Sequence, residues 1–145
     1  MKILLDADAC PVRGIISEEA VRRGISVVFV VSLAQGITPE PGVEVIRVDS
    51  GFQSVDMALI NRAEEGDVVV TSDAGLAALV LGKGGRALSF SGRIFHPATI
   101  DTILEKRHAA ARTRRGGGRV KGPRGRNRED DVRFRESLIR LLEER

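Results

Sequence analysis

Three consecutive aliphatic residues, Ile3 to Leu5, are followed at once by two aspartates, Asp6 and Asp8. An unbroken apolar run of this kind is typical of a strand buried on both faces of a sheet. Pro11 follows, and proline is favoured in the first turn of a helix. In α/β proteins, ligands bind beyond the carboxyl ends of parallel strands, where strand gives way to helix. The opening residues therefore predict a buried strand with two carboxylates at the ligand-binding edge of a sheet.

The spacing of the two aspartates bears on what they bind. Residues i and i+2 of an extended segment face the same side, so we expect the carboxylates of Asp6 and Asp8 to point into one space. Two carboxylates about 4 Å apart repel by roughly 4 kcal/mol at an effective dielectric of about 20, and a divalent cation between them removes that repulsion. Asp8 has a structural alternative, because aspartate also caps helices and a helix is expected to begin near Pro11.

The same alternation of strand and helix continues through the first two thirds of the chain. The expected strands are 26–31, 43–48, 67–71 and 86–90, and the expected helices are 12–23, 52–65 and 74–82. The strand at 43–48 alternates apolar with polar residues, which places it near an edge of the sheet. Short turns between such elements predict parallel strands and right-handed crossovers. We therefore expect one domain over residues 1–145, with an α/β core at 1–95.

Strand signals stop after Pro97, and the remaining residues predict a helical, basic extension at 96–145. A first helix begins near Pro97, carries Ile100, Ile103 and Leu104, and ends at the glycines 116–118. A basic loop follows at 119–128. A last helix begins with acidic residues at 129–131, which suit the positive end of a helix dipole. Its expected apolar face consists of Phe134, Leu138, Leu141 and Leu142.

Charge is divided unevenly along the chain. Residues 1–105 contain nine Lys and Arg against fourteen Asp and Glu, whereas residues 106–145 contain fourteen against six. Such a basic block is typical of proteins that bind nucleic acid through its phosphates. The residues expected to contact nucleic-acid phosphates are Arg114, Arg115, Arg119, Lys121, Arg124 and Arg126. A solvated, partly disordered basic tail is the alternative. With five Phe and no Tyr or Trp, base stacking on an aromatic sheet is not expected.

The composition also bears on the cellular compartment. The chain has one cysteine, Cys10, which excludes an internal disulfide and suits a reducing compartment. Its longest apolar stretch, residues 25–34, is about half the length of a membrane helix. We expect a cytoplasmic protein that has no membrane partner; the sequence does not determine its oligomeric state.

Four aspartates are expected at the same edge of the sheet: Asp6, Asp8, Asp56 and Asp73. Asp73 follows the strand at 67–71, and Asp56 is expected in the first turn of the helix at 52–65. Carboxylate ligands without His or Cys favour Mg²⁺ or Mn²⁺ over zinc. A cation held there binds phosphate and activates water. Each aspartate taken alone also suits a helix N-terminus as a cap.

Three motifs together resemble those of the YaiI/YqxD family of small bacterial proteins. They are residues 6–12 (DADACPV), residues 66–77 (GDVVVTSDAGLA), and Lys121-Gly122-Pro123 followed by Asp130, Asp131, Arg133 and Phe134. The resemblance runs in order over almost the whole chain. It extends to PIN-domain nucleases, which implies a PIN-like three-layer α/β/α fold and a ribonuclease that uses Mg²⁺ or Mn²⁺.

The same resemblance implies roles for particular residues. Asp6 matches the acid on the first strand of PIN nucleases, Asp73 matches the acid of their Thr-x-Asp turn, and Asp56 matches the acid between them. The fourth acid has no counterpart, because Ser89, Ser91 and Gly92 stand where it is expected.

Two alternatives to the nuclease stay open. Asp6-x-Asp8 after a first strand also occurs in haloacid-dehalogenase-like phosphatases, where the first aspartate is the nucleophile and Lys83 is a candidate for the helical lysine. The other alternative is a non-catalytic nucleic-acid-binding module whose aspartates serve as helix caps.

Overall fold

The computed structural model describes residues 1–32, 41–49, 52–115 and 125–144. The strands are β1 (Lys2–Asp6), β2 (Ser26–Ser32), β3 (Val43–Val48), β4 (Val68–Val70), β5 (Arg86–Leu88) and β6 (Ile94–Phe95). The helices are α1 (Arg13–Arg23), α2 (Phe52–Arg62), α3 (Ala74–Gly82), α4 (Ile100–Arg115) and α5 (Arg128–Glu143).

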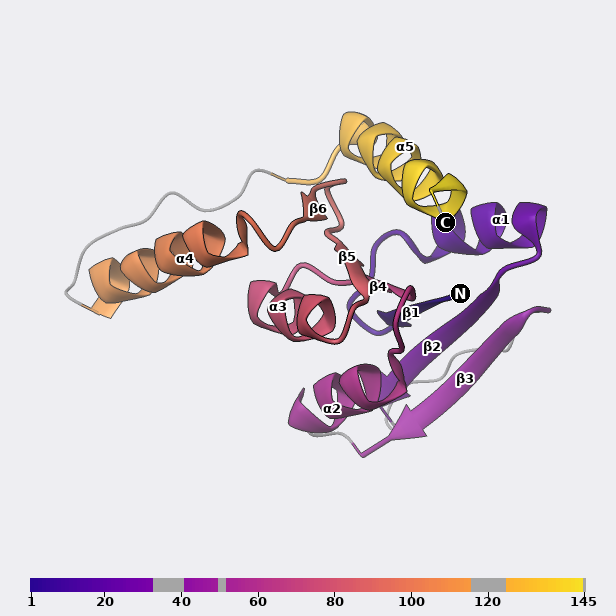
Figure 1. The fold of residues 1–145 in the computed structure, drawn as a ribbon, viewed down its shortest axis with the longest axis horizontal. Helices are drawn as coiled ribbons and strands as arrows, with labels where there is room; N and C mark the ends of the chain where they lie inside the picture. Colours follow the sequence, from indigo (N-terminus) through magenta and orange to yellow (C-terminus); the bar gives the residue numbers. More distant parts are fainter. Residues whose placement is uncertain (33–40, 50–51, 116–124, 145) are drawn as a thin grey trace.

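The strands form one sheet in the order β3-β2-β1-β4-β5-β6, and Figure 1 shows how the helices surround it. All neighbouring pairs are parallel except β5 and β6. β1 is the central strand, since Leu4 pairs with Val28 of β2 on one side and with Val69 of β4 on the other. The chain therefore builds the sheet outward from β1 in one direction and then, after β3, returns to build it in the other.

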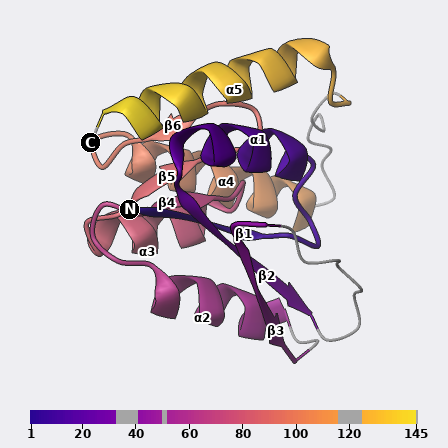
Figure 2. The same cartoon turned by 90° about the vertical axis from the view of Figure 1, so that its right-hand side faces the viewer.

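Helices cover both faces of this sheet, as Figure 2 shows with α1 and α5 above it and α2 and α3 below. One core cluster joins Ile3 and Leu5 of β1 to α1 and α5; the other joins Leu4 to α2, α3 and the start of α4. Alternate residues of β1 thus enter opposite cores, as a pleated strand requires. The predicted three-layer α/β/α fold is confirmed.

Most predicted elements are present, with two differences. The strand β6 was not predicted, because two residues are too few to show a periodic pattern. The helix α2 ends at Arg62 rather than continuing to Gly66, since Glu64 to Asp67 form a turn closed by the bond from the Asp67 amide to the Glu64 carbonyl, 3.1 Å. Gly66 adopts a φ of 84° there, a conformation that favours glycine.

The last helix packs into the core as one of the layers. Phe134, Leu138, Leu141 and Leu142 are all buried, which confirms the predicted apolar face. The helix begins with a capping box in which the Asn127 side chain accepts a bond from the Asp130 amide and the Asp130 carboxylate accepts one from the Asn127 amide. The predicted acidic first turn therefore also supplies a specific start for the helix.

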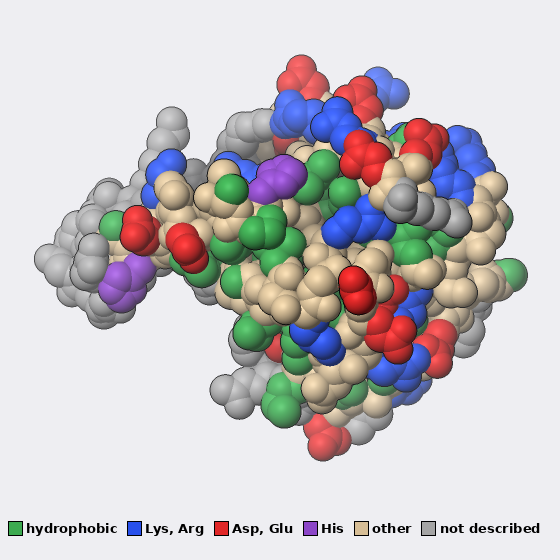
Figure 3. Space-filling view, viewed as in Figure 1, with side chains coloured by type: hydrophobic (Ala, Val, Ile, Leu, Met, Phe, Trp, Pro, Cys, Tyr) green, Lys and Arg blue, Asp and Glu red, His purple; other side chains and the backbone are tan. Residues whose placement is uncertain are grey.

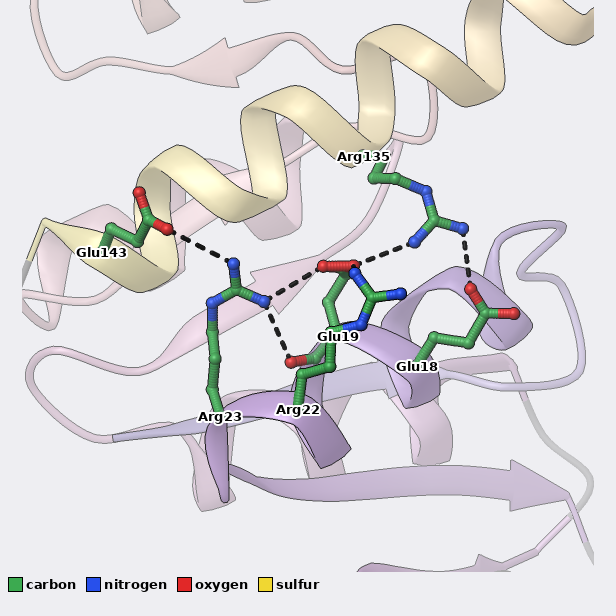
Figure 4. Close-up of polar contacts among 6 residues, drawn as sticks. All are labelled: Glu18, Glu19, Arg22, Arg23, Arg135 and Glu143. Carbon is green, nitrogen blue, oxygen red and sulfur yellow. Dashed lines mark hydrogen bonds and ion pairs between the residues drawn. The ribbon is translucent and has the colours of Figure 1, made fainter.

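A buried carboxylate links α5 to α1 (Figure 4). Glu19 of α1 is fully buried, and it accepts bonds from Arg23 at 3.0 Å and from Arg135 of α5 at 2.9 Å. Burial alone would raise the pKa of Glu19, but the bonds from Arg23 and Arg135 outweigh it and hold that pKa below its usual value. The neighbouring Glu18 also pairs with Arg135, at 2.8 Å, but its side chain is 61% exposed.

The surface carries charges of both signs, and Figure 3 shows acidic and basic side chains interspersed over one face. Figure 1 shows α4 extending away from the sheet. Within the described residues, no helix has the length and apolar character needed to span a membrane.

We predict that Glu19→Gln lowers the free energy of unfolding at pH 7 by about 2 kcal/mol, because two guanidinium groups lose a buried counter-ion. The folded-state pKa of Glu19 is lowered, so its stabilising effect is present above about pH 4.5 and is lost as the pH falls through the folded-state pKa. Urea unfolding at pH 7 and pH 3 measures both effects.

The matched control is Glu18→Gln, which removes an exposed partner of the same arginine and should change stability by less than about 0.5 kcal/mol. Equal losses in the two variants would contradict the role assigned to Glu19.

Candidate functional site

The carboxyl ends of β1 and β4 lie side by side at the centre of the sheet. Asp6 is the last residue of β1, and Thr71 directly follows β4. The connections from these two strands lead to opposite faces, because β1 continues into α1 and β4 into α3. Open α/β folds bind ligands at such a switch point, outside the carboxyl ends of the strands. The structure thus places Asp6 at the expected edge.

Asp8 does not continue the strand as its spacing from Asp6 predicts. β1 ends at Asp6, and the chain turns so that the Asp8 amide donates to Asp6 Oδ1 at 3.1 Å. Asp8 Oδ2 accepts a bond from the amide of Ser32, the last residue of β2, at 2.8 Å. The capping alternative for Asp8 is wrong, since the residue before α1 is Val12 and no side chain caps that helix. Asp8 instead connects the ends of two strands.

Asp73 lies at the start of α3 and forms the helix cap that the sequence left open as an alternative to a metal-binding role. Its Oδ1 accepts bonds from the amides of Gly75 at 2.8 Å and Leu76 at 3.1 Å. Thr71 supports it, because the Thr71 hydroxyl accepts a bond from the Asp73 amide at 3.0 Å. Thr71 and Asp73 therefore form a rigid turn that holds one carboxylate at the edge of the sheet.

Asp56 lies one turn deeper in its helix than predicted. α2 begins at Phe52, so Asp56 is in the second turn, and the first turn has no acidic residue. The predicted start of this helix at residue 52 is confirmed, and Asp56 is its fifth residue, which lies beyond the first turn of 3.6 residues. Asp56 is partly buried and still lies within electrostatic reach of Asp6 and Asp73.

Burial and the charges of neighbouring aspartates disfavour the ionised forms of Asp6 and Asp56. Burial, and then the nearby charges of Asp8 and Asp56, raise the pKa of Asp6, although bonds from the Asp8 and Ala9 amides oppose the rise. Burial and the charge of Asp73 raise the pKa of Asp56. A raised carboxyl pKa means that the ionised form of the side chain is less favourable at that position than in water. A bound cation would relieve this repulsion.

The donor set fits a hard divalent cation more closely than a zinc ion. In the part of the chain that the structure describes, no three Asp, Glu, His or Cys side chains are close enough together to enclose a metal ion. Mg²⁺ does not require such a cage, because it keeps several waters and uses one or two carboxylates together with substrate phosphates. Asp6 with Asp56 or Asp73 would suffice for this mode of binding.

The segment that lacks the fourth acid forms a tight turn after β5. Ser89 accepts a bond from the Arg93 amide at 3.0 Å, and its hydroxyl lies 3.1 Å from that of Ser91. Gly92 has a φ of 92° and packs against α5, so an added Cβ would lie 2.8 Å from the Arg133 carbonyl. The two serines and Gly92 thus shape the turn and its contact with α5.

Only part of the predicted basic surface can be placed. Arg119, Lys121 and Arg124 lie outside the described residues, and Arg114 and Arg115 are the last residues of α4. Arg126 is described: it pairs with Asp131 at 2.7 Å and donates to the Phe90 carbonyl at 2.6 Å. Phe90 comes two residues after β5, so the chain returns from the basic loop to the carboxyl edge of the sheet.

Two residues near the acids were given no role at this edge by the sequence. Arg13, in the first turn of α1, reaches back to the Ala7 carbonyl at 3.4 Å and is exposed. The sequence signal that could have identified Arg13 is its position just after the acidic motif. Ser72 accepts a bond from the Phe90 amide at 3.3 Å and so connects the ends of β4 and β5.

Cys10 is buried, and burial raises the pKa of its thiol to about 11, which leaves the thiol protonated.

Comparison with known proteins identifies relatives over the whole length of the chain. The sequence profile of the uncharacterised YaiI/YqxD family matches residues 4–144. A UPF0178 protein of Clostridium kluyveri is 42% identical over 142 residues, covering 98% of this chain and 93% of that protein. A UPF0178 protein of Exiguobacterium sibiricum is also 42% identical, over 145 residues that cover 100% and 99%. No solved structure matches the chain.

We predict that Asp6→Asn increases the free energy of unfolding at pH 7, by about 1 kcal/mol at most because the carboxyl is partly exposed and screened. A raised folded-state pKa means that the native state binds the extra proton, so the ionised carboxylate destabilises the fold as the pH rises above 3.8. The gain should therefore disappear near pH 3. Urea unfolding at the two pH values measures it.

Asp67→Asn is the contrasting control. Asp67 is buried, accepts bonds from the Lys2 ammonium at 2.6 Å and the Glu64 amide at 2.9 Å, and has a lowered pKa through these contacts even though burial opposes it. Its loss should cost about 1–3 kcal/mol at pH 7. A destabilised Asp6→Asn would refute the repulsion inferred at the edge.

Proposed function

The chain belongs to the YaiI/YqxD family, and from that premise we propose that it is a PIN-like, metal-dependent ribonuclease acting at the carboxyl edge of the sheet. The observation that carries the proposal is the position of Asp6 at the switch point between β1 and β4, where burial first and then the charges of neighbouring aspartates raise the pKa values of Asp6 and Asp56. Proteins retain unfavourable charge of this kind mainly where a site uses it. A divalent cation and an RNA phosphate would complete the site.

The aspartates would have different roles in this site. Asp6 together with Asp56 or Asp73 would hold Mg²⁺ or Mn²⁺, and the cation would neutralise charge on the phosphate and lower the pKa of a bound water. Asp73 is suited to this because the amides of Gly75 and Leu76 fix its orientation. Asp8 would position Asp6, since its own amide donates to that carboxylate. Cations of the basic loop would hold the neighbouring backbone phosphates.

Two features bear on the alternatives. Lys83, the lysine that a phosphatase of the haloacid-dehalogenase type would need, lies after the C-terminal end of α3 and donates to the Ile60 carbonyl at 2.5 Å. α3 starts at the edge that carries Asp6 and runs toward the amino ends of the strands. Lys83, which follows α3, therefore lies near the opposite end of the strands from Asp6. The binding-module alternative is favoured by the capping bonds of Asp73. It differs in predicting RNA binding without cleavage.

We predict that Asp6→Asn abolishes Mn²⁺-dependent cleavage of single-stranded RNA and weakens Mn²⁺ binding at least tenfold, because it removes a carboxylate from the repelling group. Calorimetric titration with Mn²⁺ and a cleavage assay on the same samples measure both. Since this variant should be at least as stable as the wild type, lost activity cannot be attributed to unfolding.

Asp101→Asn is the matched control, because Asp101 is exposed in the first turn of α4 and does not contribute to the pKa shifts of Asp6 and Asp56. It should keep wild-type cleavage. Cleavage that survives in Asp6→Asn would refute the nuclease. RNA binding without cleavage in the wild type at millimolar Mn²⁺ would favour the binding module.

A further prediction concerns the basic loop. Replacing Arg119, Lys121 and Arg124 together by alanine should reduce the slope of log K against log salt for single-stranded RNA by about two, since each lost phosphate contact contributes about 0.7. Fluorescence anisotropy from about 50 to 200 mM salt measures the slope. Arg62→Ala, which removes an exposed arginine paired with Glu44, is the control and should leave the slope unchanged.

A further inference from the structure

A groove of about 420 Å³ lies at the β6 side of the sheet, between that strand and α4. Its lining residues are Arg93, Ile94, Thr99, Thr102, Ile103 and Lys106. β6 is the outermost strand on this side, so the groove follows the border of the sheet.

One end of the groove lies beside the acidic edge. Arg93 pairs with Ser89 through two bonds, from the Ser89 amide to the Arg93 carbonyl at 2.8 Å and from the Arg93 amide to the Ser89 hydroxyl at 3.0 Å. Ser89 directly follows β5, whose neighbour β4 leads to Thr71 and Asp73. A chain lying in the groove would therefore reach the candidate site without crossing the molecule.

The groove carries uncompensated positive charge. The guanidinium of Arg93 and the ammonium of Lys106 form no ion pair or hydrogen bond among the described residues. Within the same residues, no Asp or Glu lines the groove. Asp101 and Glu105 of α4 are exposed, as Arg93 and Lys106 are, and neither acid lines this groove, although Glu105 and Lys106 both line a neighbouring hollow. Other arginines of the described chain do have acidic partners, such as Arg62 with Glu44 and Arg135 with Glu18 and Glu19.

The remaining lining suits a polymer better than a single anion. Ile94 and Ile103 give apolar surface between the cations, and the hydroxyls of Thr99 and Thr102 supply polar contacts. A backbone that alternates phosphate with sugar and base matches this alternation of charge and apolar surface. α4 is 16 residues long, or about 24 Å, and its sequence continues beyond Lys106 with Arg107, Arg112, Arg114 and Arg115.

We propose that the groove between β6 and α4 binds the backbone of single-stranded RNA and guides it to the aspartates. The proposal rests on the proposed function for its substrate. It assigns Arg93 and Lys106 to phosphates and places the entry path on the α4 side of the site.

The test uses a labelled single-stranded RNA titrated at several salt concentrations in the presence of EDTA, which removes the divalent cation that the proposed cleavage requires. The double variant Arg93→Ala with Lys106→Ala should bind about tenfold more weakly near 50 mM salt, with a salt slope reduced by about 1.4. Its Mn²⁺ binding should match that of the wild type. The control, Arg62→Ala with Arg140→Ala, removes two cations elsewhere and should keep the wild-type slope.

Three outcomes would overturn the proposal: an unchanged slope in the double variant, a wild type that does not bind RNA, or equal competition by polyglutamate of matched charge. The last would indicate a general site for polyanions. A wild type that binds RNA through Arg93 and Lys106 but never cleaves it would support the groove and refute the nuclease, so the two proposals can fail separately.

Discussion

The burial of β1 on both faces is the constraint on which the rest of the structure depends. Ile3, Leu4 and Leu5 are fully buried and enter two different cores, so layers of helices must cover both sides of the sheet. β1 ends at Asp6, where the chain turns. Because the chain leaves β1 toward α1 on one face and leaves the neighbouring β4 toward α3 on the other, this turn lies where the sheet offers space for a ligand.

Buried and partly buried acids occupy two different electrostatic environments in this protein. Glu19 and Asp67 are surrounded by cations and amides, and both have lowered pKa values despite burial. Burial first and then the charges of neighbouring aspartates raise the pKa values of Asp6 and Asp56. The first pair joins elements of the fold, whereas the second weakens it. This contrast is the physical reason for placing the function at the edge rather than at the ion pairs.

Acidic and basic residues are separated in the sequence but meet at one edge of the structure. Arg126 returns the chain to the Phe90 carbonyl after β5, and Arg93 lies in the turn beside Ser89. α5 stabilises this arrangement, because Gly92 contacts its backbone and the Ser137 hydroxyl donates to the Gly92 carbonyl at 2.6 Å. Phosphates could therefore contact cations on one side of the aspartates without any large movement of the chain.

The sequence by itself determined the three-layer fold and the buried face of α5, because these depend on local patterns of apolar residues, and it left the cap formed by Asp73 open as an alternative. Only the tertiary structure decided the partner of Asp8, the short strand β6 and the pairing of Glu19 with Arg135. Ser32 is 24 residues from Asp8, and Arg135 is 116 from Glu19. Contacts of this kind leave no periodic signal in the chain, since they exist only once distant elements have packed together.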